Sequence, residues 1–162
     1  MDKFIENILE AQKILYSADH LIYTTFPLIQ DKRILLQTMK SISEASTKII
    51  NTILQYDYVF KKIKLSKTPK ENFETFENNC APRYEILPSE IKTLKELFHL
   101  NNIRKNSGMT FRRDKKIVIL SDDLTTSILT YEKTKEFLNT SKEILRKTKI
   151  HIANNSQSKQ DQ

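Results

Sequence analysis

The chain has a single glycine, Gly108, in 162 residues. Glycine ordinarily makes up about 7% of a protein, and it is the residue that most easily adopts the positive φ angles of tight turns. Such scarcity predicts few left-handed positions and few tight turns, which argues against an all-β fold. Only four prolines are present, so we expect long helices to dominate the structure.

Apolar residues recur at helical spacing in four long segments of the sequence. The first is expected to end before Pro27, because the residue that precedes a proline is pushed out of the α region. Asp31 and Thr130 are predicted N-caps, and Thr68-Pro69 begins a short additional helix. The four long helices are predicted over about 3–24, 31–63, 89–107 and 131–152.

A β-hairpin is predicted between the last two long helices. Met109–Arg112 alternates apolar and polar residues, Arg113-Asp114-Lys115 forms the turn, and Lys116–Leu120 is a β-branched run. Residues 125–130 are able to supply a third strand. Gly108 is predicted to end the preceding helix in a left-handed conformation, so that the hairpin can start.

The residue patterns of the two hairpin arms predict different environments for their side chains. Met109 and Phe111 share one face of the first arm, which favours core packing for both. Residues 117–120 are apolar on both faces, as in a strand that is covered on both sides. A third strand, or burial of the second face in a homodimer, would each account for this pattern.

These features predict a mainly α, four-helix-bundle-like single domain with one short extra helix and a β-hairpin or three-stranded meander at about 109–129. The length suits one domain with its own core. The domain is expected to cover residues 1–153. The polar residues 154–162 are expected to form a disordered tail.

Several kinds of site are disfavoured by the residues present. A single cysteine, Cys80, allows neither a disulfide framework nor a zinc site built on paired cysteines. No two histidines have i, i+4 spacing, and one glycine rules out a glycine-rich phosphate loop. We therefore predict no metal and no cofactor. No apolar run approaches ~18 residues and no signal peptide is recognisable, so we expect no membrane contact and a cytoplasmic location.

Positive charge is concentrated around the hairpin. Residues 104–116 contain six basic residues and one acidic residue, a net charge of +5, whereas the whole chain has +7. Arginine's fork suits phosphate, so a surface for RNA or another polyanion is one interpretation, and a solvated turn is the other. Phe111 would stack on a base if it were exposed. The candidate nucleic-acid-binding residues are Arg104, Lys105, Arg112, Arg113, Lys115 and Lys116.

One spacing resembles a ribonuclease motif. Arg146 and His151, with four residues between them, fit the arginine–histidine pattern of the HEPN ribonucleases. That resemblance implies a four-helix protein that cleaves RNA without metal, at a cleft between two subunits. The pair lies at the end of the last predicted helix rather than at its start, and Lys147 follows Arg146 where a polar Asn, His or Asp is more usual.

A broader resemblance covers most of the chain. The segments Ala18-Asp19-His20, Thr25-Phe26-Pro27 and Pro82-Arg83-Tyr84, with His99 and the hairpin, are similar to an uncharacterised archaeal helical-bundle family. The resemblance implies a bundle with a small hairpin before the last helix and supplies no catalytic residue. This chain has Ser107-Gly108 where the family has Ser-Pro, and Thr110 where it has Glu.

Three functional hypotheses follow. The first, which we favour, is a non-enzymatic protein that binds RNA or another polyanion through the basic hairpin. The second is a HEPN-like ribonuclease or toxin that uses Arg146 and His151 as catalytic residues. The third is an adaptor whose hairpin packs against a protein partner or a second copy of the chain.

Overall fold

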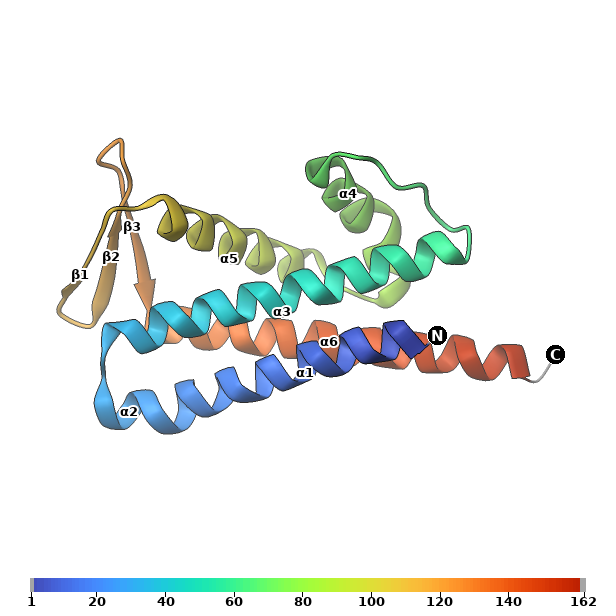
Figure 1. Cartoon of the computed structure of the whole chain (residues 1–162), viewed down its shortest axis with the longest axis horizontal. Helices are drawn as coiled ribbons and strands as arrows, with labels where there is room; N and C mark the ends of the chain where they lie inside the picture. The colour runs from blue at the N-terminus through green and yellow to red at the C-terminus, as the bar shows by residue number, and fades with distance from the viewer. Residues whose placement is uncertain (1, 161–162) are drawn as a thin grey trace.

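The computed structural model describes residues 2–160 and confirms a mainly α fold with a three-stranded antiparallel sheet (Figure 1). Most of the chain lies in long helices that pack side by side, and the sheet lies across one end of them. The helices are α1 (Asp2–His20), α2 (Phe26–Ile29), α3 (Lys32–Val59), α4 (Pro69–Thr75), α5 (Pro88–Asn106) and α6 (Tyr131–Gln160). The strands are β1 (Met109–Arg113), β2 (Lys116–Leu120) and β3 (Thr126–Thr130), in the order β1-β2-β3.

Helix α3 is the centre of the bundle. Asp31 caps its N-terminus as predicted, because the Asp31 carboxylate accepts a hydrogen bond of 2.9 Å from the backbone N–H of Arg33. Hydrogen bonds from the side chain and backbone of Arg33 lower the pKa of the Asp31 carboxyl to about 2. One face of α3 packs against α1, α5 and α6 and includes the fully buried Met39, Ile42 and Ile53.

The first helical segment passes through Pro27 instead of ending before it. A π-helical turn, η1 (Leu21–Thr25), joins α1 to α2, and Phe26 donates its backbone N–H to the Leu21 carbonyl. Pro27 has no N–H to offer the next carbonyl, that of Ile22. The Tyr131 hydroxyl donates to this carbonyl at 3.0 Å. Tertiary contact with α6 thus satisfies the backbone group that the proline leaves free.

The end of the chain also differs from the prediction. Thr130 caps α6 as expected, since its hydroxyl accepts a hydrogen bond of 3.0 Å from the Lys133 N–H. The helix then runs to Gln160, well beyond the predicted end at residue 152. Residues 154–160, expected to form a polar tail, are therefore helical, and residues 161–162 lie outside the described part of the chain.

Glycine scarcity does not mean that left-handed positions are few. Five residues other than glycine have a positive φ within the described chain, and Gly108 is not left-handed. The helix before the hairpin ends through Ser107 in an extended conformation, with its N–H bonded to the Arg104 carbonyl. The predicted role of Gly108 is therefore wrong. The five residues are Gln30, Lys61, Glu85, Asp114 and Leu124.

We predict that Gly108→Ala raises the free energy of unfolding by about 0.4–1 kcal/mol. A Cβ atom built on Gly108 meets nothing within 4 Å, and the substitution reduces the conformational entropy of the unfolded chain. Urea unfolding of both proteins measures the change. A loss of more than about 1 kcal/mol would mean that this position needs glycine's conformational freedom.

Candidate nucleic-acid interface

Two hydrogen bonds fasten the hairpin to the junction between α2 and α3. The Lys32 ammonium donates to the Thr110 carbonyl at 2.7 Å, and Nη1 of Arg112 donates to the Gln30 carbonyl at 2.8 Å. Arg112 also donates from Nε to the Asp114 carbonyl at 2.9 Å, within the turn. Part of the guanidinium of Arg112, a candidate contact for nucleic acid, is thus used in hydrogen bonds that position the hairpin.

The strand register decides which side chains face the bundle. Arg112 lies opposite Ile117, and Thr110 lies opposite Ile119, so these four residues share the inner face. Ile117 and Ile119 are buried there, together with Leu129 of β3. The third strand is confirmed, and β2 is the central strand as predicted.

Phe111 and Met109 are on the outer face, which contradicts the prediction that both pack in the core. Phe111 is 40% exposed and Met109 is 56% exposed. Phe111, Val118 and Ile128 lie in one row across the three strands, and Val118 is buried in the middle of that row. On the second face of β2, Val118 is therefore covered by the neighbouring side chains of β1 and β3. The face that carries this row is directed away from the bundle.

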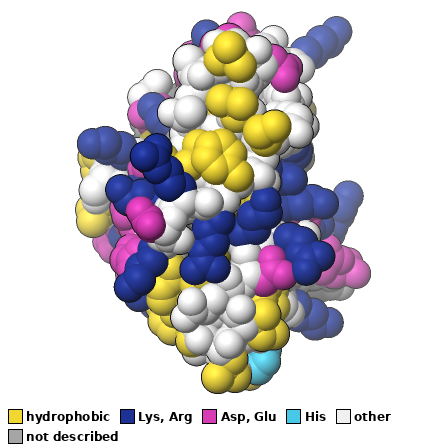
Figure 2. Space-filling view, turned by 90° about the vertical axis from the view of Figure 1, so that its left-hand side faces the viewer, with side chains coloured by type: hydrophobic (Ala, Val, Ile, Leu, Met, Phe, Trp, Pro, Cys, Tyr) yellow, Lys and Arg dark blue, Asp and Glu magenta, His cyan; other side chains and the backbone are white. Residues whose placement is uncertain are grey.

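Basic side chains border this row. Arg113 and Lys116 lie opposite each other and have the same parity as Phe111, so both belong to the outer face. Figure 2 shows this end of the molecule, with a stripe of hydrophobic side chains and Lys and Arg side chains beside and below its lower end. We call the surface formed by Met109, Phe111, Arg113, Lys116 and Ile128 the outer sheet face.

The predicted basic residues have few acidic partners. No ion pair among the described residues involves Arg104, Lys105 or any of the four basic residues of the hairpin. Arg104 is half-buried and donates two hydrogen bonds of 3.2 Å to the Asn101 side chain, whereas Lys105 is exposed. The positive charge of this region is thus available to a partner.

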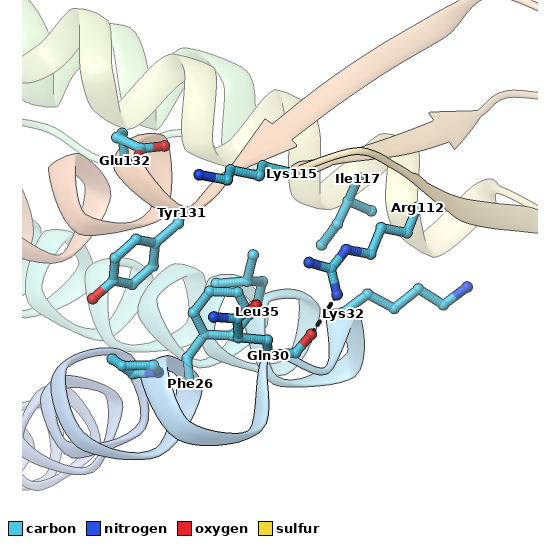
Figure 3. Close-up of a pocket in the computed structure, with 10 residues that line it drawn as sticks. Phe26, Gln30, Lys32, Leu35, Arg112, Lys115, Ile117, Tyr131 and Glu132 are labelled. Carbon is cyan, nitrogen blue, oxygen red and sulfur yellow. Dashed lines mark hydrogen bonds between the residues drawn. The ribbon is translucent and has the colours of Figure 1, made fainter.

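A pocket of about 260 Å³ lies between the hairpin and the α2–α3 junction (Figure 3). Arg112 and Lys115 line it from the hairpin, and Phe26, Gln30 and Tyr131 line it from the helices. These last three residues are not among the site residues predicted from the sequence. Gln30 and Arg112 are 82 positions apart, and no local pattern indicates that such distant segments meet.

Arg146 and His151, the predicted ribonuclease pair, line a second pocket of about 360 Å³ with Arg83 and Lys147. Each of the three cations has a carboxylate partner. Arg83 pairs with Asp57 at 2.7 Å, Lys147 pairs with Glu90 at 2.6 Å, and Arg146 pairs with Glu143. Positive charge in this pocket is therefore largely compensated.

His151 is tightly held in that second pocket. Its ring stacks on the Tyr84 ring with centroids 3.8 Å apart, and its Nε2 lies 3.2 Å from the Asn155 amide nitrogen. Burial lowers the pKa of His151, and the nearby Asp57 carboxylate opposes that shift. The neutral imidazole is thus favoured at pH 7.

Asp57 anchors the residues beneath His151. Its side chain is buried, accepts a hydrogen bond of 2.9 Å from the Tyr84 hydroxyl and pairs with Arg83. Burial raises the pKa of Tyr84, and it raises the pKa of the Cys80 thiol to about 12. Cys80 is therefore a protonated core residue rather than a nucleophile.

Comparisons of the chain with protein-family models, with curated proteins and with solved structures find no match. The two family resemblances therefore remain predictions. In the described part of the chain, no three His, Cys, Asp or Glu side chains are grouped to hold a metal ion, and no helix is both long and apolar enough to cross a membrane.

We predict that His151 makes stability fall with pH below neutrality. Its folded pKa lies below the unfolded value of about 6.5, so the unfolded chain binds the proton first. Stability is then full above pH 6.5 and decreases as pH falls toward the folded pKa. Urea unfolding at several pH values should show a weaker decrease for His151→Gln than for the wild type.

The matched control for this measurement is His99→Gln, because His99 is exposed on α5. It should follow the wild-type pH dependence. Identical pH dependence in wild type and His151→Gln would show that His151 is not responsible.

Proposed function

We propose that this protein binds single-stranded RNA, or a similar polyanion, through the outer sheet face without catalysing a reaction. The observation that carries this proposal is the exposed Phe111 ring beside Arg113 and Lys116, which have no acidic partner among the described residues. Proteins that bind single strands combine positive charge along the backbone with aromatic rings that stack on bases.

Charge supports a polyanion over an uncharged partner. Six basic residues and one acidic residue occupy positions 104–116. The phosphates of a bound polyanion would balance the positive charge that the carboxylates of this region do not. Binding should therefore release counterions and weaken as salt rises.

The rigidity of the surface supports binding of a single strand of nucleic acid. Phe111 lies beside Val118 of the paired strand β2, and the hairpin is fastened to the α2–α3 junction at two points. A ring held in this way loses little entropy when a base stacks on it. Exposed bases are found in single strands, because in duplexes they are stacked inside the helix.

The proposal predicts separate effects of charge and stacking on affinity for a labelled oligouridylate. Arg113→Ala with Lys116→Ala should weaken binding and reduce the steepness of its dependence on log salt by about 1.4, at about 0.7 per phosphate contact. Phe111→Ala should lower affinity about 5- to 150-fold, equivalent to about 1–3 kcal/mol for a stacked base, with little change in salt dependence. Fluorescence anisotropy over a range of salt concentrations measures both.

Lys67→Ala is the control, because Lys67 is an exposed lysine in the α3–α4 connection, a segment that does not contribute to the outer sheet face. Thermal unfolding verifies that each variant is folded. If all variants bind as the wild type does, the proposal is wrong. Self-association that Phe111→Ala abolishes, without RNA binding, would instead support the adaptor hypothesis.

The second candidate function is HEPN-like ribonuclease activity, favoured by the common pocket of Arg146 and His151. A lowered pKa keeps His151 neutral at pH 7, as a general base that accepts a proton from a ribose hydroxyl must be. The carboxylate partners of Arg146 and Lys147 weaken this candidate relative to the first, because they compete with phosphate.

For this candidate, His151→Ala should reduce the rate of RNA cleavage about 100-fold or more, since general acid–base groups contribute about 10²–10⁴-fold. Incubation of purified wild type, His151→Ala and the control His99→Ala with end-labelled RNA, followed by gel electrophoresis, measures cleavage. Absence of cleavage by the wild type, or equal cleavage by all three, would exclude it.

A further inference from the structure

The pocket between the hairpin and the α2–α3 junction has two chemically different sides. Figure 3 shows the Arg112 guanidinium and the Lys115 side chain extending over the pocket from the hairpin. Phe26 and Tyr131 line the pocket from the helices, and Ile117 lies beside Arg112. A ligand that fills the pocket therefore meets two cations from the hairpin and apolar, aromatic surface from the helices.

The cations retain donors for an anion. No hydrogen bond or ion pair to Lys115 is found among the described residues, and Arg112 uses only Nε and Nη1. The Lys32 ammonium, in contrast, points away from the pocket and donates to the Thr110 carbonyl. Arg112 and Lys115 are thus the groups able to hold a phosphate, and Glu132 is the acid that opposes them.

The apolar side suits a flat ring. Phe26 and Tyr131 pack with their centroids 5.0 Å apart and their planes tilted by 30°. The Tyr131 hydroxyl is anchored on the Ile22 carbonyl, so the ring has one orientation. Aromatic and aliphatic side chains with a few fixed polar groups are typical of small-molecule sites.

The size of the pocket limits the ligand. Its volume of about 260 Å³ lies just below the range of about 300–1,000 Å³ that is typical of ligand pockets. It would therefore hold one small unit rather than a length of polymer. The Arg146–His151 pocket is larger, at about 360 Å³, but its cations already have carboxylate partners.

We infer that this pocket binds one nucleoside monophosphate unit, either free or as the 5′-phosphorylated end of an RNA chain. The phosphate would contact Arg112 and Lys115, and the base would pack against Phe26 and Tyr131. The inference deepens the proposed RNA binding and rests on it only for the RNA-end form, because a free mononucleotide needs no outer sheet face.

The test is calorimetric titration of the full chain with adenosine 5′-monophosphate and with adenosine. We expect the monophosphate to bind at least about tenfold more tightly, because only it offers charge-assisted hydrogen bonds. Lys115→Ala should weaken monophosphate binding by about tenfold or more, and Lys67→Ala should leave it unchanged. Failure of the wild type to bind the monophosphate, or wild-type binding by Lys115→Ala, would overturn the inference.

A second variant distinguishes a loss of binding from a loss of folding. Glu132→Gln removes the acidic group from the pocket, so it should tighten monophosphate binding about two- to threefold, by removing repulsion from the phosphate. A gain in affinity does not arise from an unfolded protein. Unchanged or weaker binding by this variant would contradict the assigned position of the phosphate.

Two oligonucleotides distinguish the two sources of the ligand. An RNA with a 5′-phosphate should bind more tightly than the same RNA with a 5′-hydroxyl if the pocket takes an RNA end. Equal binding of the two, together with binding of the free monophosphate, would assign the pocket to free mononucleotides. Phe111→Ala tests the outer sheet face alone: it should weaken RNA binding and leave the monophosphate affinity unchanged, so the two proposals can fail separately.

Discussion

One-sided burial of the small sheet is the constraint on which the proposed sites depend. Ile117, Ile119 and Leu129 are buried against the helices, and burying each such side chain contributes about 1.5–3 kcal/mol. The hydrogen bonds from Lys32 and Arg112 contribute about 0.5–1.5 kcal/mol each. Apolar burial therefore holds the sheet on the bundle, and the two directional hydrogen bonds set its angle and register.

The same arrangement creates two surfaces from one hairpin. Side chains on the inner face close the core and, at the turn, line the pocket with Arg112 and Lys115. Side chains of opposite parity form the outer sheet face, where Phe111 is exposed. Both surfaces take their positive charge from residues that lie within a few positions of one another.

The elements of the fold could be predicted because their signals are local. The caps at Asp31 and Thr130 and the three strands follow from nearby residues, and the structure has them where the sequence indicates. The first helix continues past Pro27 because Tyr131, more than a hundred residues away, donates to the carbonyl that the proline leaves free. No local pattern contains that contact.

The candidate site could be predicted only in part, for a related reason. Charge alone singled out the hairpin, but the orientation of Phe111 depends on which face of β1 meets the bundle. The two apolar residues of that short strand, Met109 and Phe111, share one face, so alternation favours burial of the face that the structure exposes. The Gln30 carbonyl, which accepts from Arg112, lies on the inner side, and this distant contact decides that Phe111 faces outward.

The most direct test of the account is to locate the RNA-binding surface by residue. Titration of ¹⁵N-labelled protein with a short oligouridylate, followed by amide chemical shifts, reports contacts along the whole chain. We predict that the largest changes occur at residues 109–118 and 126–130. Changes confined to residues 83–85 and 143–155, or no changes at all, would contradict it.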